Sequence, residues 1–227
     1  TASRRQDVPT ENTNLRSGAI AKHGWELFSC HSDAISQQVV ALAFRLGTLV
    51  QGRYGSSVEV LSPSPEASAH PSSLSASYGL GPLPLHVDTS HLPVPARYLV
   101  LGCVNPGKQR VPTLVFDRYD LSLSSNQMRL LRSAVFHVQN GRRSFYGSIQ
   151  GLNPAFIRFD PGCMKPVTQE AEEALALFSF EAINEHVQEI FLRAGDIMVI
   201  DNWRMLHGRA AVPQLDSYRS LIRCTVA

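Results

Sequence analysis

The chain has 227 residues, enough for one substantial hydrophobic core, and its 21 basic and 19 acidic residues leave a formal net charge of +2. A hydrophobic fraction of 44% with 18% charged residues excludes bulk disorder. The near balance of charge argues against a dedicated nucleic-acid or membrane-surface binder. No apolar stretch reaches the roughly 18 residues that are needed to span a bilayer.

The first part of the chain predicts an arm and then a helix. Residues 1–17 are polar and aperiodic, so we expect a flexible arm there and a single domain over 18–227. Asp33 is expected to cap a helix that ends near Gly52. Its apolar stripe consists of Ile35, Val39, Leu42, Leu46 and Leu49. The Ser/Pro-rich residues 62–77 predict a surface loop.

After residue 80 the pattern changes to short strands. Strands are expected over 98–104, 113–116, 155–160, 196–202 and 218–226, with a hairpin turn at Asn140-Gly141. Helices are expected over 122–133 and 168–192; the stripe of the second is Ala171, Leu175, Phe178 and Ala182. These elements predict a mainly β fold with flanking helices, a sandwich or barrel.

The four cysteines, Cys30, Cys103, Cys163 and Cys224, are spread along the chain without a C-x-x-C pair. A chain of this size does not need disulfides for stability, and zinc binding by thiolates would require local pairing. Together with the lack of an apolar signal segment at the start, this predicts free thiols and a cytoplasmic protein.

The first candidate site residues are one of the eight histidines and an aspartate close to it in the sequence. His86 and Asp88 are two residues apart, so on a strand both side chains would point to the same face. A second histidine from a distant strand would complete a set of two imidazoles and one carboxylate, which leaves metal positions open. The other H-x-D match, His31 to Asp33, is explained by the helix cap.

The C-terminal segment supplies a candidate for that second histidine and two arginines. His207 follows an apolar strand and a turn, and Arg219 and Arg223 share a face of the last strand. Two guanidinium groups on an otherwise apolar strand are costly unless anions pair with them. The anions would be either carboxylates of this chain or a carboxylate-bearing ligand, which arginine binds bidentately.

The order H-x-D, His and Arg resembles the Fe(II)/2-oxoglutarate-dependent oxygenases of the taurine dioxygenase and clavaminate synthase-like family, over roughly residues 55–226. The resemblance rests on His86, Asp88, Thr113, His207 with Gly208-Arg209, and Arg219. It implies a double-stranded β-helix, or jelly roll, in which His86, Asp88 and His207 bind Fe(II). It also implies that Arg219 and Thr113 hold the far carboxylate of 2-oxoglutarate.

The same resemblance implies a dioxygenase that uses O₂ and hydroxylates an unactivated C–H bond of a small, anionic or amino-acid-like molecule, with release of succinate and CO₂. Desaturation or ring formation remains an alternative outcome. Arg223 is expected to face the anionic group of the substrate, and Arg158 is a weaker candidate for the same pocket. No catalytic residue beyond the metal ligands is expected.

Other classes stay open on the sequence alone. A non-catalytic jelly-roll module that binds a small molecule would not produce succinate. A nucleic-acid or protein demethylase of the same superfamily would need a basic groove, and a zinc hydrolase would have no role for Arg219 and Thr113. We expect a small-molecule partner, no nucleic acid and no membrane; the oligomeric state cannot be read from the sequence.

Overall fold

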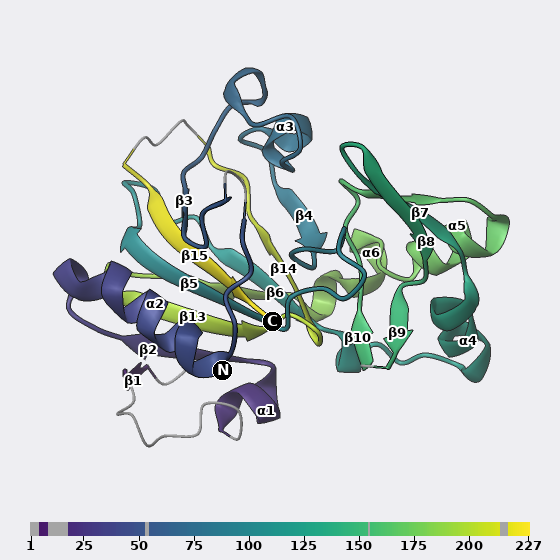
Figure 1. Ribbon diagram of the computed structural model, residues 1–227, viewed down its shortest axis with the longest axis horizontal. Coiled ribbons are helices and arrows are strands. Elements are labelled where there is room, and N and C mark those ends of the chain that lie inside the picture. Colours follow the sequence, from purple (N-terminus) through teal and green to yellow (C-terminus); the bar gives the residue numbers. More distant parts are fainter. Residues whose placement is uncertain (1–4, 9–17, 53–54, 154, 214–217) are drawn as a thin grey trace.

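The computed structural model describes residues 5–8, 18–52, 55–153, 155–213 and 218–227. Two sheets face each other (Figure 1). The major sheet has the order β1 (Gln6–Asp7), β2 (Trp25–Ser29), β13 (Asp196–Asp201), β5 (Tyr98–Asn105), β15 (Ser220–Val226) and β3 (Glu59–Leu61). The minor sheet has the order β12 (Gln188–Ile190), β6 (Thr113–Asp117), β14 (Met205–Arg209) and β4 (Leu83–His86). The predicted mainly β jelly roll with flanking helices is confirmed.

The side chains of the central strand β5 point alternately into two hydrophobic cores, one on each face of the major sheet. Leu99, Leu101 and Cys103 point between the sheets, where they meet Val115 of β6 and Met205 of β14. The intervening residues of β5 face the outside of the barrel and pack against a helix. The strand is apolar from Tyr98 to Cys103 because both of its faces are buried over that stretch.

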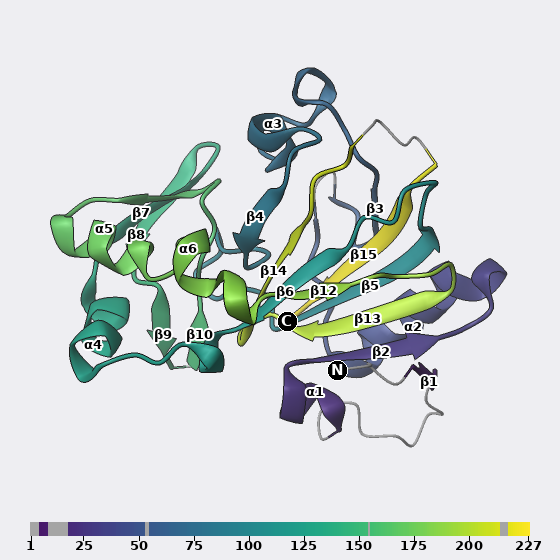
Figure 2. The ribbon, with the colours of Figure 1, turned by 180° about the vertical axis from the view of Figure 1, so that it is seen from behind.

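That helix is α2 (Ile35–Leu46), which lies across the outer face of the major sheet, in front of it in Figure 1 and behind it in Figure 2. Of the predicted stripe, Ile35, Val39, Leu42 and Leu46 are buried. The predicted end near Gly52 is wrong, because α2 ends at Leu46 and Leu49 lies beyond it, in a β-bridge with Val226. Gly102 permits the close approach, since a Cβ there would lie 2.4 Å from Val39 Cγ2. The predicted Asp33 cap is wrong, because a 3₁₀ turn (Ser32–Ala34) precedes α2 and no side chain caps it.

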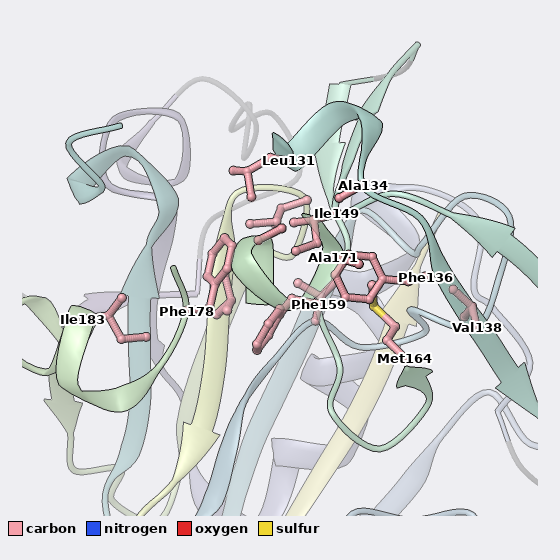
Figure 3. Close-up of a cluster of buried hydrophobic side chains, with 14 of the residues drawn as sticks. Leu131, Ala134, Phe136, Val138, Ile149, Phe159, Met164, Ala171, Phe178 and Ile183 are labelled. Atoms are coloured by element: carbon pink, nitrogen blue, oxygen red, sulfur yellow. The ribbon is translucent and has the colours of Figure 1, made fainter. Parts of the chain in front are cut away.

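A separate lobe is inserted between β6 and β12 and lies to one side of the jelly roll in both views (Figures 1 and 2). Its elements are α4 (Ser125–Ser133), β7 (Phe136–Asn140), β8 (Arg143–Gly147), β9 (Gln150–Leu152), β10 (Ala155–Ile157), β11 (Met164–Pro166), α5 (Gln169–Ala176) and α6 (Phe180–Ile183). Figure 3 shows its core, in which side chains of these elements and of the segments between them, among them Phe136, Phe159 and Phe178, pack together. The same cluster reaches Phe116 and Leu206 of the minor sheet, which joins the lobe to the barrel.

Within the lobe, the structure agrees with the local sequence signals as far as the end of α5 at Ala176. The hairpin β7–β8 forms with Gly141 at φ 59°, and Ser124 and Gln127 make a capping box at the start of α4. The predicted helix over 168–192 is wrong. The helix α5 ends at Ala176. Ala182, which belongs to the predicted apolar stripe, is exposed. The last part of the segment forms strand β12, which pairs with β6.

The remaining expectations concern the N-terminal segment, residues 62–77, the cysteines and membrane-spanning helices. Most of the predicted arm, 1–4 and 9–17, lies outside the described residues, while Gln6–Asp7 pairs in parallel with β2. The segment 62–77 contains only a 3₁₀ turn (Glu66–Ser68) and the start of α3 (Ser75–Tyr78). All four cysteines are free, as predicted. None of the helices in the described ranges is long and apolar enough to cross a membrane.

Candidate metal centre

Three side chains that are far apart in the sequence converge between β4 and β14. His86 ends β4 and lies opposite His207 of β14 in the strand register, with their ring centroids 4.4 Å apart. Asp88 Oδ1 lies 3.6 Å from His86 Nε2, and Asp88 Oδ2 lies 3.8 Å from His207 Nε2. The donor atoms of all three buried residues fall within 4.8 Å of one another. Asp88 reaches this point from the turn after β4, not from the strand itself.

The spacing and chemistry of this set fit a metal ion. Two ligand atoms at about 2.1 Å from one ion and at right angles to each other lie about 3 Å apart. The separations of 3.6 and 3.8 Å here are longer by less than 1 Å, a difference that a change in side-chain torsion angles can close. Two imidazoles and one carboxylate on one side of an ion leave further positions open, an arrangement that suits non-haem Fe(II). The three side chains therefore have the donor types and the geometry of a facial metal triad.

Hydrogen bonding sets which nitrogen of His86 is available. His86 Nδ1 lies 2.9 Å from the Pro84 carbonyl oxygen. A carbonyl oxygen only accepts, so Nδ1 carries a proton and Nε2 faces the carboxylate. His207 Nδ1 is buried and has no hydrogen-bond partner among the described residues.

The electrostatics favour a charged carboxylate beside imidazole donors. Burial by itself would raise the pKa of Asp88, but the Arg223 charge and then the contact with His86 hold that pKa well below its usual range. Burial, and after it the charge of His86, lowers the pKa of His207 to about 3. Burial alone would lower the pKa of His86, but the close contact with the Asp88 carboxylate raises it overall. Metal binding here would depend on pH, because a metal ion and protons compete for imidazole nitrogens.

Asn202, in the turn between β13 and β14, fixes the main chain of Asp88. Its Oδ1 accepts from the Asp88 backbone N–H at 3.0 Å, and its Nδ2 donates to the Asp88 carbonyl at 3.0 Å and to the Ala96 carbonyl at 2.7 Å. Asn202 is completely buried. Thr89 adopts φ 60° and accepts from the Ala96 N–H through Oγ1 at 2.7 Å, so the turn is closed on both sides.

Arg158 supports the same turn from the inserted lobe. Its guanidinium donates to the carbonyls of Ser90, of Leu92 at 2.5 Å and of Pro93 at 2.8 Å. It also lies over the ring of Phe145 at 4.9 Å. The buried Arg158 therefore donates to backbone carbonyls of this chain, which differs from the substrate contact that the sequence suggested.

Arg223 pairs with carboxylates of this chain, one of the two alternatives that the sequence left open. Its Nη1 donates to both oxygens of Asp88 at 3.1 Å. Its Nε and Nη2 donate to Glu59 Oε2 at 3.0 and 2.5 Å. The arginine that was expected to face a substrate anion therefore contacts a residue of the triad directly.

Thr113 and Arg219 belong to the same end of the barrel. Thr113 begins β6 and is buried on the face of the minor sheet that carries His207, because Arg209 pairs with Thr113 and His207 with Val115. Arg219 is buried just before β15 and donates to the Pro106 carbonyl at 3.1 Å. It lines a cavity of about 240 Å³ together with Val111, which lies two residues before Thr113.

Two buried or half-buried arginines, Arg209 and Arg219, lie close to each other at this end of the barrel. Burial, and after it the charge of Arg219, lowers the pKa of Arg209 to about 10. Arg209 donates to the carbonyls of Gly79 and Gly81, which orient its guanidinium without neutralising its charge. Two guanidinium groups that repel each other in a buried position favour the binding of an anion between or beside them.

Comparisons with known proteins agree with this geometry. The family model for "Taurine catabolism dioxygenase TauD, TfdA family" matches residues 116–225, a range that contains His207 and Arg219 but neither His86 nor Asp88. The crystal structure of non-heme iron oxygenase OrfP in complex with Fe and alpha-ketoglutaric acid is similar at a TM-score of 0.73 and 20% identity, and the match covers 92% of this chain and 76% of that chain.

A second solved structure, asparagine oxygenase in complex with Fe(II), 2S,3S-3-hydroxyasparagine and succinate, has a TM-score of 0.74 at 16% identity, again over 92% of this chain and 76% of that one. No curated protein sequence matches the chain. Fold and donor set define a jelly-roll protein with a facial metal triad. The family-model match over residues 116–225 agrees with the resemblance to the TauD-like Fe(II)/2-oxoglutarate oxygenases that the sequence predicts, and the solved structures support the same fold.

Two residues of this site were missed by the sequence reasoning. Asn202 follows an apolar strand in the run Ile200-Asp201-Asn202, which indicates a turn, but nothing in the sequence connects it with Asp88 at a separation of 114 residues. Glu59 stands in a short alternating segment and is 164 residues away from Arg223. Only the strand pairing of the folded chain brings these partners together.

Proposed function

We propose that the protein is an Fe(II)- and 2-oxoglutarate-dependent dioxygenase that hydroxylates an unactivated C–H bond of a small, amino-acid-like molecule. The observation that carries the proposal is the convergence of His86, Asp88 and His207 in a buried position. Similar solved structures add support, because they are complexes with hydroxylated arginine or hydroxylated asparagine together with succinate.

In this proposal the chain holds and orients the reactants. His86, Asp88 and His207 would bind the iron, while Arg219 and Thr113 would hold the far carboxylate of 2-oxoglutarate at their end of the barrel. Iron(II), 2-oxoglutarate and O₂ together supply the oxidising chemistry and release succinate and CO₂. Asn202 and Arg158 keep the Asp88 turn rigid, so that the carboxylate is preorganised for the metal.

The proposal also assigns a substrate contact to Arg223 and an amino acid as the class of substrate. Arg223 would meet an anionic group of the substrate only through the guanidinium N–H groups that Asp88 and Glu59 do not use, since arginine has five N–H donors. An amino acid, which carries both charges, suits a place where a carboxylate and a guanidinium stand side by side better than a simple anion does.

The test is turnover with a panel of amino acids. The purified protein with Fe(II), 2-oxoglutarate, ascorbate and O₂ should release succinate, and the release should rise at least severalfold with a true substrate. The variant His207→Ala should release none. A protein that binds iron but never converts 2-oxoglutarate into succinate would be a binding module, and the proposal would be wrong.

A further inference from the structure

We propose that Glu59 is a positioning residue for the metal centre: it holds the Arg223 guanidinium in the orientation in which Nη1 contacts Asp88, and thereby fixes the direction of that carboxylate. The inference rests on the proposed function, because it takes Asp88 to be a metal ligand. It assigns a role to a side chain on an edge strand that no motif of the sequence identifies.

The strand register places the first pair. Glu59 of β3 and Arg223 of β15 are directly paired residues of antiparallel strands, so both side chains project from the same face of the major sheet. Both are largely buried, with side-chain exposures of 18% for Glu59 and 17% for Arg223. The ion pair therefore lies at a defined point of the sheet and is not a mobile surface contact.

The shape of the guanidinium then determines the second contact. Glu59 takes one edge of the group, through Nε at 3.0 Å and Nη2 at 2.5 Å. The guanidinium is planar and its donors have fixed directions, so fixing one edge also fixes where Nη1 points. Nη1 lies 3.1 Å from each oxygen of Asp88. An arginine held only by Asp88 would be free to rotate about its long side chain.

Glu59 also limits how strongly Arg223 competes with a metal ion. Both Asp88 oxygens face the same Nη1, whereas the triad needs one of them for the ion. Because Glu59 engages Nε and Nη2, Nη1 is the donor group that remains directed at Asp88. Without Glu59, Arg223 would turn more of its donors to Asp88 and hold it away from the metal.

The experiment measures Mn²⁺ binding to the full-length metal-free protein from the loss of the electron paramagnetic resonance signal of free Mn²⁺. Glu59→Ala should weaken Mn²⁺ binding about tenfold, as the loss of a group that orients a metal ligand does. Glu59→Asp keeps the charge but is too short to hold Arg223, and should weaken binding to a similar extent. Glu59→Gln keeps a carbonyl oxygen in place and should stay within about threefold of wild type.

The matched control is Asp117→Asn, which weakens the ion pair of Asp117 with Arg204. That pair is similarly buried, with side-chain exposures of 11% and 16%. The control should lower thermal stability and leave Mn²⁺ affinity unchanged. If it weakens binding as much as Glu59→Ala does, the effect is one of general packing and the inference is wrong.

Two further results would overturn the inference. Unchanged Mn²⁺ binding in both Glu59→Ala and Glu59→Asp would remove the positioning role while leaving the proposed function intact. An equal loss in Glu59→Gln would assign the effect to charge and not to orientation. Absence of Mn²⁺ binding in the wild-type protein is a distinct outcome, since it would contradict the proposed function as well. If Glu59→Ala does not fold, Glu59→Asp carries the test.

Discussion

Asn202 holds the main chain of Asp88 from both sides, accepting from its N–H and donating to its carbonyl, each at 3.0 Å. A metal ligand in a turn lacks the support that a strand would give it. The buried amide of Asn202 supplies that support from the turn between β13 and β14, so one side chain links the two halves of the site.

Replacing Asn202 by alanine should therefore affect both stability and metal affinity. The change leaves buried backbone groups of Asp88 and Ala96 without partners, which we expect to cost about 2–3 kcal/mol in the free energy of unfolding. Metal affinity should fall about 10- to 100-fold, as for other groups that orient a ligand. Urea unfolding and Mn²⁺ titration measure the two effects.

Ser90→Ala is the control for Asn202→Ala. It removes a hydrogen bond to the Val87 carbonyl from the same turn without touching Asp88. We expect a loss of about 1 kcal/mol in the free energy of unfolding and no change in metal affinity. Unaltered metal binding in a folded Asn202→Ala protein would show that the amide does not position the ligand.

Arg158→Lys separates support of the Asp88 turn from substrate binding. Lysine keeps the charge but cannot donate to three carbonyls from one plane, so we expect a loss of about 2 kcal/mol in the free energy of unfolding with little change in the KM for the substrate. Arg132→Lys, at an exposed position in the same lobe, should change neither quantity. A raised KM with unchanged stability would restore Arg158 as a substrate contact.

Arg219 and Thr113 are tested through 2-oxoglutarate. Arg219→Lys should raise the KM for 2-oxoglutarate about 10- to 100-fold because a charge-assisted bidentate contact is lost, and Thr113→Val should raise it up to about tenfold. Arg110→Ala, on the exposed part of the same cavity, should have a much smaller effect. Mn²⁺ affinity should be unchanged in all three variants. Loss of metal binding in Arg219→Lys would contradict the assigned role.

Much of the barrel could be predicted because its signals are local. The run over 98–104 is apolar at every position because β5 is buried on both faces, and the hairpin at Asn140-Gly141 depends on a glycine with positive φ. The helix over 168–192 could not be delimited, because the pairing of Gln188–Ile190 with β6 is a long-range contact that overrides helical periodicity. Tertiary pairing of this kind leaves no trace in a short window of sequence.

The site was predicted as a set of residues and not as a set of contacts. The convergence of His86, Asp88 and His207 agrees with their spacing and donor chemistry in the sequence, and their role as metal ligands stays a prediction. The spacing argument placed Asp88 on a strand, whereas Asp88 lies in a turn that Asn202 and Arg158 support. The pairing of Arg223 with Glu59 depends on the register of β3 and β15, which no local pattern encodes.

The central claim is that His86, Asp88 and His207 together hold an iron ion that binds 2-oxoglutarate. An anaerobic titration of the protein with Fe(II) and 2-oxoglutarate tests it most directly, by visible absorption spectroscopy. The account predicts a weak charge-transfer band that needs both additions, shifts when a substrate binds, and is lost in His86→Ala. A wild-type protein that is folded and loaded with iron but shows no such band with 2-oxoglutarate would contradict the account.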